Sequence, residues 1–99
     1  MKIHSQKELT TLQLQVEGRL DTTTAPQLEE ALGSNLIGIT KLIIDFTTLD
    51  YISSAGLRVL LTAHRTMIKQ DGQMVIRGAN AEVQEVFLIT GFSEILNIE

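Results

Sequence analysis

The feature that most constrains the fold is an apolar run in the middle of the chain. Between Lys41 and Phe46, the aliphatic residues Leu42, Ile43 and Ile44 follow one another without a polar residue. A half-exposed strand or an amphipathic helix would place part of this run in water, whereas a strand covered on both faces buries all of it. The run therefore predicts the central strand of a sheet that carries helices.

Strict alternation predicts a second strand nearer the N-terminus. From Thr11 to Glu17, polar residues alternate with the aliphatic residues Leu12, Leu14 and Val16. This period of two is typical of a half-exposed strand. Gly18 is expected to end the strand, and residues 2–5 are expected to pair with it as a hairpin through a turn at residues 6–8.

Three segments have the spacing and the start signals of helices. The first follows Thr24, which stands at capping-box spacing from Gln27 with Pro26 in the first turn. The second spans residues 55–70 after the N-cap candidates Ser53 and Ser54, and Asp71-Gly72 is expected to end it. Its predicted buried stripe is Leu57, Leu60, Leu61, His64 and Ile68.

The third helix follows Asn80, packs Val83, Val86 and Phe87 on one face, and stops at Gly91. A short buried strand at residues 74–76 precedes it, and the end of the chain is expected to add an edge strand or only to pack down. The predicted fold class is α/β: one domain over residues 1–99, with a mixed sheet of four to five strands and three main helices.

Composition excludes several classes of function. The chain has 99 residues, a formal net charge of −4, no Trp and one Tyr, so it lacks both the positive charge and the stacking aromatics that nucleic-acid binding needs. It has no Cys and no long apolar segment, so disulfides, thiolate metal sites and membrane insertion are not expected. A soluble protein of the cytoplasm is predicted.

No catalytic constellation emerges. Ser54 and His64 are separated by ten residues of one predicted helix, about 15 Å along its axis, so they cannot form a nucleophile–base pair. His4 and His64 are isolated, and the outer glycine spacing of a phosphate loop at Gly33 and Gly38 lacks the following Gly-Lys-Ser/Thr. No enzyme activity, catalytic residue, metal or cofactor is expected.

Two polar features remain open to more than one interpretation. Asp21, Asp45 and Asp50 lie at the ends of predicted elements, where they either gather at one site or serve as caps and turn residues. Ser53 and Ser54 lie where a loop enters a helix. A phosphate there would meet free backbone N–H groups and the positive end of the helix dipole, although capping alone also accounts for the pair.

The segment Ile52-Ser53-Ser54-Ala55-Gly56-Leu57, together with Gly18-Arg19-Leu20-Asp21, resembles the STAS domain of bacterial anti-sigma factor antagonists. The resemblance covers essentially the whole chain. It implies a partner-switching protein that, when unphosphorylated, binds an anti-sigma factor that is also a GHKL-type serine kinase. It further implies inactivation by phosphorylation and recovery through a metal-dependent, PPM-type serine phosphatase.

The resemblance also assigns residues. The phosphate acceptor of the family stands two residues before the Gly-Leu pair, which is Ser54 here, and many members carry Asp where this chain has Ser53, the rival acceptor. Asp21 matches an Asp of the docking surface. The partner-binding set implied is Asp21, Ser53, Ser54, Gly56, Leu57 and Arg58.

Two alternatives stand beside this expectation. One keeps the fold without the switch, as a STAS subunit that docks constitutively in a transport or signalling assembly. The other is a small hydrolase that uses Ser54, for which the sequence supplies no base. The chain is expected to be a monomer.

Overall fold

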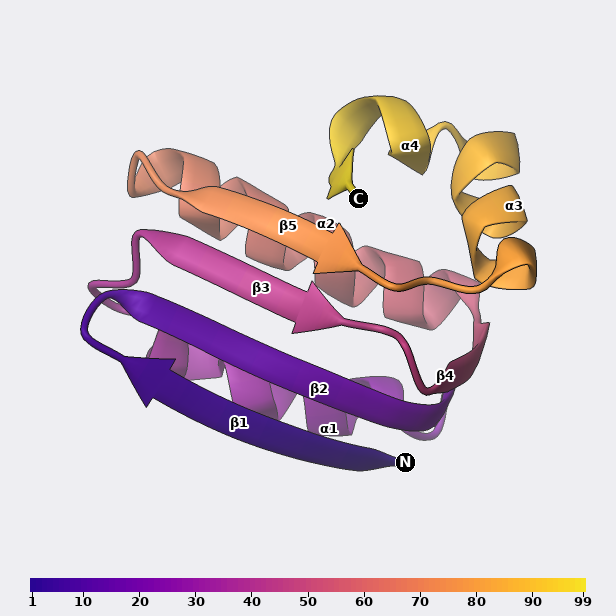
Figure 1. Cartoon of the computed structure of the whole chain (residues 1–99), viewed down its shortest axis with the longest axis horizontal. Helices are drawn as coiled ribbons and strands as arrows, with labels where there is room; N and C mark the ends of the chain where they lie inside the picture. The colour runs from indigo at the N-terminus through magenta and orange to yellow at the C-terminus, as the bar shows by residue number, and fades with distance from the viewer.

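The computed structural model describes all 99 residues, which form one six-stranded sheet with helices packed against it (Figure 1). Five strands lie in the order β1-β2-β3-β5-β6, and β4 pairs with β2 off this path. The β1–β2 pair is antiparallel and every other pair is parallel. The strands are β1 (Lys2–Glu8), β2 (Thr11–Leu20), β3 (Lys41–Asp45), β4 (Leu49–Ile52), β5 (Gln73–Arg77) and β6 (Asn97–Ile98).

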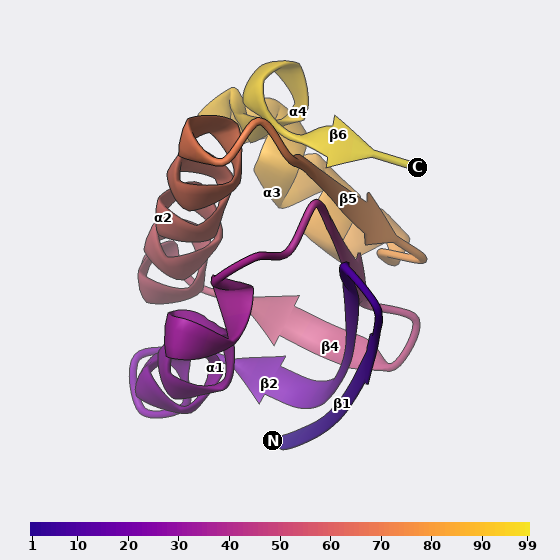
Figure 2. The same cartoon turned by 90° about the vertical axis from the view of Figure 1, so that its left-hand side faces the viewer.

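Three main helices and two short ones accompany the sheet. Figure 2 shows α1 and α2 side by side on one face of the strands, with α3 and α4 beyond β5. The helices are α1 (Ala25–Leu32), the 3₁₀ turn η1 (Gly33–Leu36), α2 (Ser54–Lys69), α3 (Ala81–Thr90) and α4 (Phe92–Ile95). The α/β class, the mixed sheet and the three main helices are confirmed. The edge strand considered for the end of the chain is present as β6, and the additional strand β4 raises the number of strands to six, above the predicted four to five.

The predicted central strand is β3, which pairs with β2 on one side and β5 on the other. All three of its aliphatic residues are buried, and Leu42 and Ile44 belong to the main apolar core beneath α1 and α2. Ile43 points to the opposite face, where Gln13 and Val75 flank it in register.

The N-terminal hairpin is confirmed, but its strands are longer than predicted. Strand β1 continues to Glu8, so the turn lies at Leu9 and Thr10 rather than at residues 6–8. Strand β2 does not end at Gly18. It passes through that residue at φ +101° and shifts register before Arg19, which is a bulge that only glycine accommodates without strain.

The buried face of α2 is turned relative to the predicted stripe. Its buried residues are Gly56, Leu57, Val59, Leu60, Ala63 and Met67, whereas Ile68 is 57% exposed and His64 is half-buried. The helix ends at Lys69, and Asp71, not Gly72, adopts the left-handed conformation. Space at Gly72 is tight, because a Cβ there would lie 3.0 Å from the backbone carbonyl oxygen of Thr40 and 2.6 Å from Cε of Met67.

Candidate functional site

The site is built where two parallel strands end beside each other. Strand β2 pairs with β4 so that Arg19 is opposite Tyr51 and Leu20 is opposite Ile52. The backbone N–H of Ser53 donates to the carbonyl oxygen of Leu20 at 2.9 Å. This hydrogen bond continues the pairing one step past the strands, so the segments that begin at Asp21 and Ser53 lie side by side. Figure 2 shows both strands pointing toward the α1 and α2 layer.

Asp21 organises the loop between β2 and α1. Its Oδ1 accepts hydrogen bonds from the backbone N–H and hydroxyl of Thr23, at 3.0 and 2.8 Å, and from the backbone N–H of Thr24 at 3.1 Å. These donors favour the charged form, and the Thr23 hydroxyl contributes most to lowering the pKa of the Asp21 carboxyl. The carboxylate therefore carries a fixed negative charge at the edge of the site.

The predicted capping box at the start of α1 is absent. The Thr24 hydroxyl donates instead to the carbonyl oxygen of Arg19 at 2.7 Å and accepts from the N–H of Asp21 at 2.8 Å. Gln27 reaches the carbonyl oxygen of Met1 at 3.3 Å. Thr24 is thus the N-cap residue by position, but its hydroxyl closes the loop on the strand rather than capping α1.

Arg19 adds a positive charge that the sequence did not single out for this site. Its guanidinium lies 4.2 Å from the centroid of the Tyr51 ring, and its Nε lies 3.8 Å from Oδ2 of Asp21. The stacking orients the cation against β4 while it stays largely in water. Arg19 and Tyr51 come together only because β2 has a bulge after Gly18 and pairs with β4. Local sequence patterns predicted neither the bulge nor β4.

The two serines have different environments. Ser53 is the N-cap of α2 and half-buried, and its Oγ accepts from the N–H of Gly56 at 3.5 Å. Ser54 is the first helical residue, and its side chain is exposed and forms none of the described hydrogen bonds. Arg58, one turn further along α2, is exposed and has no ion-pair partner within the chain. Ser54 is therefore the freer of the two hydroxyls.

Gly56 and Leu57 lie beneath this surface rather than on it. Both are buried, and a Cβ on Gly56 would lie 2.7 Å from Cγ of Leu20 and 3.0 Å from Cγ1 of Ile52. Absence of a side chain at position 56 lets the first turn of α2 rest directly on the ends of β2 and β4. The pair thus positions the serines from below.

The three carboxylates do not form one cluster around the serines. Asp45 closes the turn after β3, accepting from the backbone N–H of Thr47 at 2.8 Å, whereas exposed Asp50 borders a hollow between β4 and α3. No group of three or more His, Asp and Glu side chains is arranged to hold a metal ion. None of the helices combines the length and the apolar character required to cross a bilayer.

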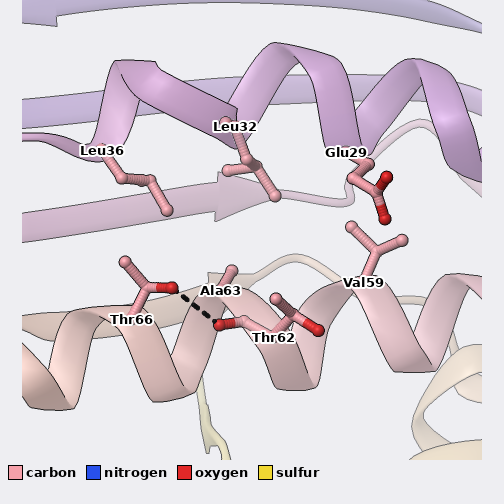
Figure 3. A pocket seen from close by; sticks show the side chains of 8 residues that line it. Glu29, Leu32, Leu36, Val59, Thr62, Ala63 and Thr66 are labelled. Atoms are coloured by element: carbon pink, nitrogen blue, oxygen red, sulfur yellow. Dashed lines mark hydrogen bonds between the residues drawn. The ribbon is translucent and has the colours of Figure 1, made fainter.

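A small pocket opens between α1 and α2 (Figure 3). Its volume is about 100 Å³, and the side chains of Leu32, Leu36, Val59 and Ala63 form its apolar part. Thr62 and Thr66 line it from α2, and the Thr66 hydroxyl donates to the carbonyl oxygen of Thr62 at 3.1 Å. The pocket lies along the seam between the two helices and contains none of the predicted site residues.

The fold, with paired ends of β2 and β4 and serines at the start of α2, is that of a known class of domains, as comparison with known proteins shows. Residues 2–99 match the model of the STAS domain family, and the chain belongs to that family. The resemblance noted in the sequence is therefore confirmed for essentially the full length.

Named relatives extend this result. The chain is 35% identical over 86 residues to the anti-sigma-B factor antagonist of Listeria monocytogenes, covering 85% of this chain and 75% of the relative. The crystal structure of an anti-sigma factor antagonist from Mycobacterium paratuberculosis superposes with a TM-score of 0.86 at 21% identity, over 98% of this chain and 83% of the other. Phosphorylated SpoIIAA of Bacillus superposes at 0.78 with 17% identity, over 99% and 91%. The last two likenesses establish the fold.

Proposed function

We propose that this protein is an anti-sigma factor antagonist whose binding is switched off by phosphorylation of Ser54. The support is the name of its Listeria relative, at 35% identity, together with the exposed serine at the start of α2. In this proposal the unphosphorylated chain binds an anti-sigma factor that is also a GHKL-type serine kinase. A PPM-type phosphatase restores it, and the chain acts as a cytoplasmic monomer without enzymatic activity of its own.

The observation that carries the proposal is the contrast between the two neighbouring hydroxyls. A kinase needs an acceptor oxygen that it can reach and orient toward the γ-phosphate of ATP. Ser54 is exposed and uncommitted, whereas Ser53 is half-buried and its oxygen faces the N–H of Gly56. Ser54 is accordingly the acceptor, and Ser53 supports the helix that presents it.

In this proposal, the charge of the phosphate prevents binding of the partner. A phosphate adds about −1.5 to −2 charges at neutral pH. At Ser54 it would lie near free N–H groups at the start of α2, so the fold tolerates it. A partner surface fitted to a neutral hydroxyl would instead meet a bulky anion beside the existing charge of Asp21, and both repulsion and desolvation oppose docking.

The docking surface in this proposal consists of the exposed or half-buried residues around Ser54, with Gly56 and Leu57 as its support. Asp21 shapes one edge and Arg58 offers a cation to a partner carboxylate. Arg19, stacked on Tyr51, adds a second cation on the side of β4. A surface with charges of both signs around neutral hydroxyls favours one orientation of the partner over others.

The test begins with capture. Chains carrying Ser54→Ala and Ser54→Asp are immobilised and exposed to extract from the source cell, and bound GHKL-type ATPases are identified by mass spectrometry. Ser54→Ala should retain the ATPase and Ser54→Asp should lose it, because only the second adds charge. The purified ATPase is then incubated with wild type and ATP, and the phosphorylated residue is located by mass spectrometry.

Ser53→Ala is the matched control, since it removes the neighbouring hydroxyl and leaves Ser54 in place. Wild type and Ser53→Ala should be phosphorylated and Ser54→Ala should not. Phosphate found on Ser53, or undiminished labelling of Ser54→Ala, would contradict the assignment. Equal capture by Ser54→Ala and Ser54→Asp would favour a STAS subunit that docks constitutively.

A further inference from the structure

The outer face of α3 exposes two large apolar side chains among polar ones. Leu88 and Ile89 are 71% and 75% exposed, while the opposite face of the same helix packs Val83 and Phe87 into the core. A surface helix normally presents polar residues outward. The next helix, α4, adds Ile95, which is 49% exposed. Three of the seven large exposed hydrophobic residues of the chain therefore lie on two consecutive short helices.

All charged side chains in the C-terminal segment that carries these residues are negative. Residues 78–99 contain Glu82, Glu85, Glu94 and Glu99 and no Lys or Arg. The remaining 77 residues hold eight acidic and eight basic side chains, so the whole formal net charge of −4 arises in this C-terminal segment. Arg77 pairs with Glu99 at 3.1 Å, which leaves the three glutamates of α3 and α4 without an ion-pair partner.

A shallow hollow of about 550 Å³ lies next to the exposed Leu88. Phe87 and Leu88 of α3 line it with Ile98 of β6, and Glu85 stands at its border. The hollow can therefore receive an apolar side chain while a cation attached to the same partner segment meets a carboxylate. The apolar contact area and the adjacent negative charge together determine which partner segment can bind in the hollow.

We propose that the face formed by Glu82, Glu85, Leu88, Ile89, Glu94 and Ile95, the α3–α4 face, binds a basic segment of a protein partner through apolar anchor side chains. A second copy of the chain does not fit, because a symmetric contact would bring two acidic faces together. Anionic lipid surfaces and nucleic acids are repelled for the same reason.

This binding goes beyond the antagonist function proposed above and is separable from it. The α3–α4 face uses helices other than α2, and none of its residues belongs to the predicted site around Ser54. Glu82 borders the same hollow as Tyr51, so the two surfaces adjoin, but Ser54 lies outside the α3–α4 face and the partner is expected to bind whether or not Ser54 is phosphorylated. Failure of either proposal leaves the other standing.

Three short, helical, fluorescently labelled peptides serve as probes: one of Lys and Leu in amphipathic register, one with Glu in place of Lys, and one with Ser in place of Leu. Binding to the full chain is followed by fluorescence anisotropy and by ¹H–¹⁵N NMR. The Lys/Leu peptide should bind about tenfold more tightly than either of the others, because it alone offers both apolar anchors and complementary charge. Its chemical-shift changes should fall on α3, α4 and β6.

Two sets of variants locate the binding. Leu88→Ser with Ile89→Ser should weaken it about tenfold, as expected for loss of anchoring contacts. Ile37→Ser is the matched control, because Ile37 is equally exposed, at 72%, but lies outside the face. Glu82→Gln with Glu85→Gln should weaken binding and flatten its salt dependence, whereas Glu29→Gln with Glu30→Gln on α1 should not.

The proposal is overturned by equal binding of the Lys/Leu and Glu/Leu peptides, or by shift changes confined to other elements. It is also overturned if sedimentation shows a dimer that Leu88→Ser with Ile89→Ser abolishes, or if phospholipid vesicles bind the chain more tightly than the Lys/Leu peptide does. Ser54→Asp should bind the peptide as wild type does, which keeps this outcome independent of the switch.

Discussion

At the scale of single residues, the site depends on what is missing at position 56. A methyl group there would collide with Leu20 and Ile52, the last residues of β2 and β4, so glycine lets α2 begin directly on the strand ends. The sequence indicated that Gly56 belongs to the motif, but its reason is tertiary. Its backbone needs no left-handed conformation, and the close approach exists only once β4 is placed.

Asp21 yields a prediction about pH. Hydrogen bonds led by the Thr23 hydroxyl hold the pKa of its carboxyl below the ordinary value of 3.8. A lowered folded-state pKa stabilises the fold above the unfolded-state value, and this contribution is lost as the pH falls through the folded-state value. Wild type should therefore be more stable than Asp21→Asn at neutral pH, and the difference should shrink progressively below pH 3.8.

Urea unfolding of both chains at neutral pH and at several values below 3.8 measures this difference. Asp50→Asn is the matched control, because Asp50 is exposed and accepts none of the described side-chain hydrogen bonds. A gap between wild type and Asp21→Asn that stays constant across the range would show that the carboxylate charge contributes nothing to the loop.

At the scale of elements, local periodicity predicted some parts of the fold and not others. Strand β3 and helix α3 were predicted because their signals, an apolar run and a capped helix ending in glycine, are contained within each segment. No strand was predicted at β4, which lies directly before the point where Ser53 and Ser54 were expected to join a loop to a helix. Only its first and last residues, Leu49 and Ile52, are buried, so it shows no period of two, and its pairing depends on the bulge in distant β2.

Some residues of the candidate site were likewise predicted from local sequence patterns, and others were not. Ser54 at the start of α2 was predicted from local signals and family resemblance, and the structure places it there, exposed. The cation–π contact between Arg19 and Tyr51 was not predicted, because it joins two strands 32 residues apart and requires their exact register. Local sequence patterns indicate which residues begin a helix, but they do not indicate which distant segments of the chain come into contact.

The N-cap of α3 ties two elements together and makes a second prediction. Asn80 accepts from the N–H of Val83 at 2.8 Å and donates to the carbonyl oxygen of Leu49 in β4 at 3.1 Å. Asn80→Ala removes both hydrogen bonds and should cost about 1–2 kcal/mol of unfolding free energy. Ser53→Ala should cost less, because the capping distance at α2 is 3.5 Å. Chemical denaturation compares them, and equal losses would contradict the interpretation.

At the scale of the whole molecule, the sheet has a protected centre and weak edges. Strand β3 is paired on both sides and its aliphatic residues are buried, whereas β1 pairs only with β2 and is mostly exposed. At the other edge, β6 has two residues. Opening of the edges leaves most core contacts intact, so it requires less free energy than opening of β3.

Hydrogen exchange followed by NMR tests this ordering. The amides of Leu42, Ile43 and Ile44 should exchange most slowly, at the rate of global unfolding, and those of β6 should exchange much faster. Strand β1 should be intermediate, since one of its sides lacks a partner strand. Protection of β1 equal to that of β3 would show that the hairpin opens only with the entire sheet.

The pairing of β2 with β4 also bears on how proteins of this kind diverge. At the end of each strand, an outward residue precedes an inward one: Arg19 before Leu20, and Tyr51 before Ile52. In the proposed docking surface, the outward residues contact the partner, whereas the inward residues of the same two strands are part of the core. After gene duplication, substitutions at Arg19 and Tyr51 can give the two copies different binding partners. Leu20 and Ile52 can stay unchanged in both copies and keep the core intact.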